Sequence, residues 1–207
     1  MPPTSDRHER RTEIEAAAFA LLKELGYKKT SMLLIAKRAQ ASNQTLYAWY
    51  RNKQELFRGI IASFGGAVRE QLQASLQAEQ DPHQALRALG PALLRFTTDE
   101  YAIIMNRAAV IDAAETGVLP QAIDEVARDV LYPLICALMQ RLVHQRVFVS
   151  DMAPEGMAQT YIDLLLGELQ FRQALGNVPP LTEPEMIERS ERAFRLTCRL
   201  FQRPEAP

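Results

Sequence analysis

The side chains best suited to hydrogen bonding are concentrated between Gln40 and Phe57, in the stretch QASNQTLYAWYRNKQELF. It begins with hydroxyl and amide side chains, contains three aromatic residues within four positions, and ends with charged residues. Amides and hydroxyls donate and accept hydrogen bonds, whereas a lysine ammonium only donates. This chemistry suits contact with a polar partner. Aromatic residues can also fill a core, however, so the helices that position them decide the question.

Patterns typical of catalysis or metal binding are missing from the sequence. His8, His83 and His144 are far apart, and none lies in an H-E-x-x-H spacing. Cys136 and Cys198 have no histidine close in sequence, and we find no Gly-rich phosphate loop and no nucleophile elbow. Distant residues can meet in a fold, so an all-helical enzyme stays a remote alternative. The sequence predicts no enzyme, no cofactor and no metal site.

The composition is that of an ordinary soluble globular protein, with 47% hydrophobic and 24% charged residues among 207. It contains no run of about 18 apolar residues, the length that a membrane span needs, so we expect no membrane partner. Both cysteines lie in apolar helical runs. That favours buried, reduced thiols and a cytoplasmic protein.

Charge is distributed unevenly along the chain. Residues 1–58 contain 11 Lys or Arg and 6 Asp or Glu, whereas residues 59–207 contain 13 and 19. A basic N-terminal part on an acidic remainder is typical of a module that meets phosphate. Chance scatter of solvated charges would look the same, so the charge pattern alone leaves both interpretations open.

Apolar residues recur at three- and four-residue steps almost throughout, which predicts an all-α fold. Gly90-Pro91 is expected to disturb its helix, and Pro133 is expected to kink another. The expected helices cover residues 6–25, 31–38, 43–50, 53–79, a segment from 82 onwards, 99–115, 120–146, 154–175 and 183–202.

The first three of these helices fit a helix-turn-helix plan. The second and third are short and are joined by a turn over residues 39–42. Ala36 is small, as required where two helices cross closely, and Leu46 lies ten residues later on the inner face of the third helix. Ser42 is well placed to cap that helix.

The segment TSMLLIAKRAQASNQTLYAWYRNKQELF, residues 30–57, resembles the DNA-binding domain of the TetR family of transcriptional regulators. The shared features are Thr30-Ser31, Ile35-Ala36, Ala39, Ser42, Thr45-Leu46-Tyr47, Tyr50, Lys53 and Glu55-Leu56. The resemblance implies an N-terminal three-helix DNA-binding domain over residues 1–58. A helical ligand-binding and dimerisation domain over 59–207 would follow it.

Two positions depart from the family pattern. Gln40 stands where the family usually has glycine, in a turn that often needs a left-handed residue. The turn is therefore either slightly strained or built differently. Leu33 and Leu34 occupy positions that are commonly polar in the family, and one of them is expected to be exposed.

The resemblance assigns the predicted DNA contacts. The start of a recognition helix meets base edges, where Asn and Gln can bond adenine and a Thr methyl can touch thymine. It implies phosphate contacts for Tyr47 and Lys53 and a further one for Thr30 or Ser31, while Trp49 could reach the DNA backbone or pack on the first helix. The predicted set is Thr30, Ser31, Ser42, Asn43, Gln44, Thr45, Tyr47, Trp49 and Lys53.

For residues 59–207 the resemblance implies an effector pocket and a dimer interface. The pocket candidates are Phe64, Phe96, Tyr101, Met105, Arg107, Tyr132, Met139 and Phe171, each of which could equally belong to the core. Arg107 could anchor an anionic effector, or it could pair with Asp112, Asp163 or Glu168. The dimer candidates are Ile162, Leu165, Leu166, Leu169, Ile187, Phe194, Leu200 and Phe201, and an internal core is the alternative.

These features predict a homodimeric DNA-binding regulator. We expect a repressor that binds a palindromic operator in double-stranded DNA and is released by a small-molecule effector. The alternative within the same class is a helix-turn-helix protein that answers to a protein partner or to no ligand. An enclosed apolar cavity would favour the small molecule.

Overall fold

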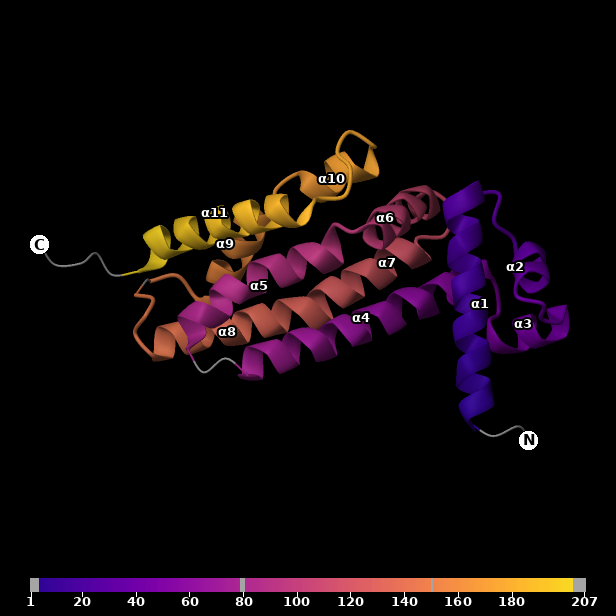
Figure 1. Cartoon of the computed structure of the whole chain (residues 1–207), viewed down its shortest axis with the longest axis horizontal. Coiled ribbons are helices and arrows are strands. Elements are labelled where there is room, and N and C mark those ends of the chain that lie inside the picture. Colours follow the sequence, from indigo (N-terminus) through magenta and orange to yellow (C-terminus); the bar gives the residue numbers. More distant parts are fainter. Residues whose placement is uncertain (1–3, 79–80, 150, 203–207) are drawn as a thin grey trace, which may run out of the picture. The chain divides into compact units, whose positions relative to one another are not determined.

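The computed structural model describes residues 4–78, 81–149 and 151–202, with the side chains of residues 4–7 and 75 also left out of the description. Within these ranges every regular element is a helix, and the one extended contact is an isolated bridge between Phe148 and Gln202 (Figure 1). The predicted all-α fold is therefore confirmed. None of the helices described is long and apolar enough to cross a membrane.

The contacts divide the chain into two compact units. The head unit comprises Met1–Phe64 and Ile104–Asp124, and the body unit comprises Gly65–Ile103 and Glu125–Pro207. Helix α4 (Lys53–Ala78) contributes residues to both units, and the predicted domain boundary at residue 58 falls inside it.

The head unit begins with α1 (Thr4–Leu25), which ends at Gly26 with φ +77°. Helix α2 (Met32–Arg38) follows, then α3 (Asn43–Trp49), and each starts at a serine whose side chain accepts a backbone N–H bond. These short helices form because the caps satisfy their first donors and because Ile14, Ile35 and Leu46 are buried between them. Helices α6 (Glu100–Ala113) and α7 (Val118–Glu125) complete the unit with residues 104–124.

The turn between α2 and α3 is built on a left-handed residue. Gln40 has φ +50°, and the following Ala41 N–H donates to the Ala36 carbonyl at 2.9 Å. Arg10 supports the turn from α1 by donating to the Gln40 carbonyl at 2.7 Å. The turn thus keeps the left-handed geometry without glycine, at a cost of about 1 kcal/mol.

The body unit contains α5 and the elements from η1 to α11. Beyond α4, its helices are α5 (Pro82–Thr97), the π-helical turn η1 (Val126–Leu131), α8 (Tyr132–His144), α9 (Pro154–Leu166), α10 (Leu169–Ala174) and α11 (Glu183–Phe201). Thr182 and Glu185 form a capping box at the start of α11. Buried residues of α5, α8, α9 and α11 form the core of this unit.

Three expectations for the body helices need correction. The helix expected over 120–146 changes to π geometry at 126–131, where the Tyr132 N–H donates to Ala127, because Pro133 has no N–H to continue the α pattern. The helix expected over 154–175 is interrupted at Gly167, whose φ is +48°. Conversely, α5 continues through Pro91.

Candidate nucleic-acid interface

Helix α3 has one buried side and one exposed side. Leu46 is completely buried, while Asn43 and Gln44 are exposed at the start of the helix. Ser42 accepts the Thr45 N–H at 3.0 Å, and the two hydroxyls lie 2.8 Å apart. The Ser42 oxygen therefore orients the helix start, and the amides of Asn43 and Gln44 are accessible to a partner.

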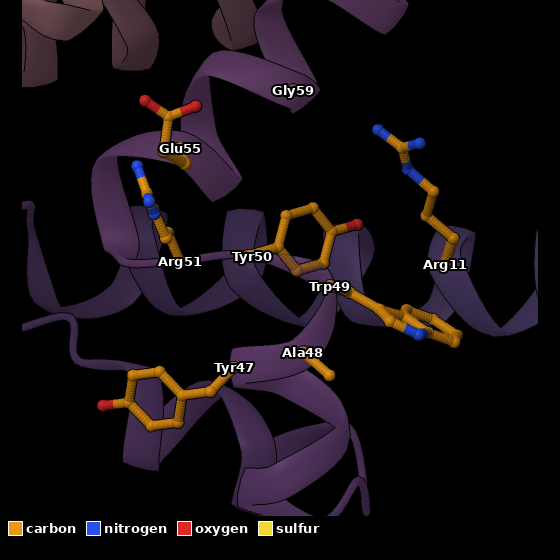
Figure 2. A pocket seen from close by; sticks show the side chains of 8 residues that line it. All are labelled: Arg11, Tyr47, Ala48, Trp49, Tyr50, Arg51, Glu55 and Gly59. Atoms are coloured by element: carbon orange, nitrogen blue, oxygen red, sulfur yellow. The ribbon is translucent and has the colours of Figure 1, made fainter.

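The three aromatic residues of this region have different surroundings. Tyr50 is buried and donates to Glu15 at 3.1 Å, and burial raises the pKa of Tyr50 to about 12. Tyr47 is 55% exposed, so its hydroxyl can reach a phosphate, whereas Trp49 is half-buried. Tyr47 and Trp49 point to opposite sides of α3 (Figure 2), as expected for residues about 200° apart on a helix.

A polar hollow of about 560 Å³ lies where α3 meets α4 (Figure 2). Arg11 from α1 and Arg51 from the α3–α4 turn both line it, beside Tyr47 and Trp49. Gly59 keeps room for Arg11, because a Cβ there would lie 3.3 Å from the guanidinium nitrogen Nη2. Arg51 is not among the predicted DNA contacts, because it lies outside the positions that carry the family resemblance.

Lys53 is half-buried and already has partners within the head unit. Its ammonium donates to the Tyr27 carbonyl at 2.9 Å and lies 3.9 Å from the centre of the Tyr27 ring. Burial lowers the pKa of Lys53, while the carboxylates of Glu115 and Asp112 oppose that shift. An ammonium has three donors, so the bond to Tyr27 leaves others for an incoming phosphate.

The two hydroxyls at the start of α2 are not equivalent. Thr30 is 1% exposed and donates to the Gly26 carbonyl at 2.9 Å, so its hydroxyl is not positioned for the predicted phosphate contact. Ser31 is exposed and caps α2, so it is the candidate that fits. Leu33 and Leu34 are both exposed, where one of them was expected to be.

A buried carboxylate ties α6 and α7 to the rest of the head unit. Asp112 accepts hydrogen bonds from the Tyr27 hydroxyl at 2.9 Å, the Thr116 hydroxyl at 2.7 Å and the Leu119 N–H at 3.0 Å. Burial alone would raise the pKa of Asp112, but these bonds outweigh it and lower the pKa. Asp112 is therefore a structural hydrogen-bond acceptor. It was one of the predicted partners of Arg107, whose side chain is exposed.

The body unit contains a partly open apolar pocket of about 420 Å³, which we call the body cavity. It is formed by residues of α5, η1, α8, α9 and α10. Its aliphatic lining residues are Leu93, Ala127, Leu131, Ile135, Ile162, Leu165 and Leu166. Helical periodicity indicates which of these apolar residues share one face of a helix. It does not show that the packed helices leave a space between them.

Among the predicted pocket residues, Tyr132 lines the body cavity. Phe64, Met105 and Arg107 belong to the head unit, so they do not join this site. Met139 is completely buried in the core, and Phe171 is 67% exposed at the surface. Phe96 and Tyr101 are half-buried and lie outside the lining.

The predicted dimer residues fall on different sides of their helices. Ile162, Leu165 and Leu166 line the body cavity, and Leu169, Phe194 and Phe201 are buried within the chain. Ile187 and Leu200 of α11 are 48% and 58% exposed. These two residues are thirteen positions apart, about 140° around α11, so they lie on different sides of that helix.

Comparison with known proteins identifies the same N-terminal segment. The family model described as "Bacterial regulatory proteins, tetR family" matches residues 14–60. An HTH-type transcriptional regulator from Mycobacterium bovis is 27% identical over 83% of this chain and 79% of its own. The HTH-type regulator BetI of Yersinia pestis is 27% identical over 84% of this chain and 86% of its own.

Solved structures share the fold over nearly the whole chain. A TetR-family regulator from Mesorhizobium loti matches with a TM-score of 0.82 at 20% identity, over 95% of this chain and 98% of its own. The flavonoid-responsive regulator FrrA matches with a TM-score of 0.70 at 26% identity, over 96% of this chain and 100% of its own. These relatives are transcriptional regulators and not enzymes. Together with the capped α3 and its buried Leu46, they show that this chain belongs to the TetR family of helix-turn-helix transcriptional regulators.

Proposed function

We propose that this regulator is a homodimeric repressor that binds a palindromic operator through α3. The observation that supports this most directly is the polarity of α3, which buries Leu46 and exposes Asn43 and Gln44 beside the Ser42 cap. Side chains at the start of a recognition helix reach base edges in the major groove. Gln44 is our candidate base reader, and Tyr47 and Ser31 are our candidate phosphate contacts.

A dimer is required for a site of useful length. One recognition helix reads only a few base pairs, whereas a two-fold dimer reads two half-sites about one helical turn apart. Ile187 and Leu200 of α11 are exposed, and each supplies apolar surface for such a contact. A protein that binds chromosomal DNA would work in the cytoplasm.

We further propose that a small molecule in the body cavity releases the DNA. A cavity of about 420 Å³ lies within the range of roughly 300–1,000 Å³ that small-molecule sites occupy. Among the structural relatives, FrrA is described as flavonoid-responsive, and a Thermus thermophilus FadR was solved with lauroyl-CoA. Helix α4 contributes to both units, so it can carry a change from the body to the head.

The test starts by selecting bound fragments from the organism's own genome with the purified protein. We expect a palindromic consensus, and the neighbouring genes will indicate the effector. Gel-shift titrations with this operator then compare Gln44→Ala, which should relax preference at one position per half-site, with Tyr47→Phe, which should weaken binding to all sequences. If both variants bind the operator as the wild type does, the proposed interface is wrong.

Oligomeric state is tested separately by sedimentation at micromolar concentration. We expect a dimer, and Ile187→Glu with Leu200→Glu should shift it towards monomer. A wild-type protein that sediments as a monomer at this concentration would contradict the palindromic mode of binding.

A further inference from the structure

We infer that the body cavity takes a medium-chain aliphatic carboxylate, with its chain among the leucine and isoleucine side chains and its carboxylate at Arg128. The inference deepens the proposed function, because it rests on the body cavity being the effector site. It goes beyond that proposal by naming the chemical class of the ligand and the side chain that recognises its polar end.

The wall of the cavity selects for an aliphatic chain. Leu93 comes from α5, Ile135 from α8, and Ile162, Leu165 and Leu166 from α9, and Tyr132 is the aromatic residue among those described in the lining. Branched aliphatic side chains offer close contact to a flexible chain but no broad faces for stacking a flat ring. A saturated chain therefore fits this surface better than a planar aromatic ligand does.

The four neutral polar side chains of the lining already donate hydrogen bonds within the protein. The Thr97 hydroxyl donates to Leu93 at 2.7 Å, Gln170 donates to the Thr97 carbonyl at 3.1 Å, and Gln159 donates to Asp163 at 2.8 Å. The Tyr132 hydroxyl donates to the Glu155 carbonyl at 2.8 Å. A ligand that displaced these bonds would leave polar groups unsatisfied, so these side chains are poor anchors.

Arg128 is the charged residue among those described in the lining, and its side chain is exposed. It also interacts within the chain, but a guanidinium has five N–H donors, so others are left for a ligand. A guanidinium binds a carboxylate through paired hydrogen bonds. The neighbouring Glu125 and Asp129 on the same turn compete for it, so we expect a moderate contribution from the charge. Arg128 lies in η1, and π-helical turns of this kind are frequent at functional sites.

The part of the lining that α9 contributes is held in place by α11. Arg189 is partly buried and donates to the carbonyls of Leu165 and Leu166, the second at 2.8 Å, where α9 ends before Gly167. These bonds satisfy carbonyls that a helix end would leave open. The surface that contacts the aliphatic chain of the ligand is thus formed before binding, which reduces the entropy cost of binding.

The test measures binding directly by titration calorimetry without DNA, using octanoate, decanoate, decan-1-ol and decyltrimethylammonium below their micellar concentrations. We expect one decanoate per chain. Each additional methylene from octanoate to decanoate should tighten binding about four-fold. Decan-1-ol should bind at least about ten-fold more weakly than decanoate, and the cationic ligand more weakly still.

Two variants locate the ligand. Arg128→Gln should reduce the preference for decanoate over decan-1-ol by about ten-fold, while the matched control Arg199→Gln, an exposed arginine of α11 outside the lining, should leave it unchanged. Leu166→Trp should fill the cavity and weaken both ligands. Thermal unfolding of each variant checks that it folds, and Ile162→Trp replaces Leu166→Trp if that variant does not.

The inference is overturned if decanoate does not bind, if decan-1-ol or the cationic ligand binds as well, or if Arg128→Gln keeps the full preference. These outcomes are separable from the proposed function, since DNA binding is measured independently. Operator binding without decanoate binding would refute the ligand class alone. Decanoate binding without release of the operator would refute the release mechanism and leave the ligand class standing.

Discussion

The head unit and the body unit build their candidate sites in opposite ways. In the head unit, the predicted base and phosphate contacts lie within residues 30–53, and local serine caps set their helices. In the body unit, the cavity is lined by residues between Leu93 and Gln170 that come from five helical elements. A site made of residues close together in the sequence can therefore be recognised as a motif. A site formed by the packing of distant helices cannot.

Leu46→Ala should have the largest effect and tests how strongly the interface depends on the head core. Leu46 is completely buried, and truncating such a leucine costs about 2–5 kcal/mol of unfolding free energy. We expect operator binding to be lost and thermal unfolding to begin earlier. Leu175→Ala is the control, because that side chain is 59% exposed and should change stability by less than about 0.5 kcal/mol.

Asp112→Asn tests whether the buried acceptor holds α6 and α7 in the head unit. An amide cannot accept from all three donors, so we expect a loss of about 1.5–3 kcal/mol at pH 7. Urea unfolding measures this, with Asp151→Asn as an exposed control. An unchanged midpoint would show that the bonds to Asp112 do not stabilise the unit.

Comparing the wild type with Asp112→Asn also predicts how the stability of the protein depends on pH. The folded pKa of Asp112 is lower than its value of about 3.9 in an unfolded chain, so its contribution is present above that pH. It is lost as the pH falls through the folded pKa. The stability difference between the wild type and Asp112→Asn should therefore narrow in acid, and a constant difference down to about pH 2 would contradict the assignment.

Ser42→Ala removes the side-chain cap of α3 and should cost about 1 kcal/mol, with weaker operator binding because the helix start is less ordered. Circular dichroism during thermal unfolding gives the stability change, and gel shift gives the affinity. Ser31→Ala makes the matched change at α2. If Ser42→Ala and Ser31→Ala lose the same stability but differ in operator affinity, the effect of capping is separated from the effect on DNA recognition.

The smallest effect is expected at the turn. Gln40→Gly should stabilise the head unit by up to about 1 kcal/mol, because glycine adopts a positive φ without a Cβ penalty. A higher unfolding temperature for Gln40→Gly than for Gln40→Ala would support this. A lower temperature would mean that the entropy lost by glycine on folding outweighs the relief of strain.

Much of the fold could be predicted because its signals are local. Ser42 caps α3 as predicted, and the helices expected over residues 31–38 and 43–50 are present as α2 and α3. Caps and hydrophobic periodicity act over three or four residues, so the sequence shows them directly. The family motif added the positions of the candidate DNA contacts.

The features that could not be predicted depend on which helix faces pack against one another. Leu165 and Ile187 are both apolar helix positions, yet one lines the body cavity and the other is exposed. Periodicity identifies an apolar stripe but not the surface that covers it. In the same way, the sequence by itself determined that α3 begins at Ser42, whereas only the tertiary structure brought Asp112 to Tyr27, because 85 residues separate them and no local interaction records the contact.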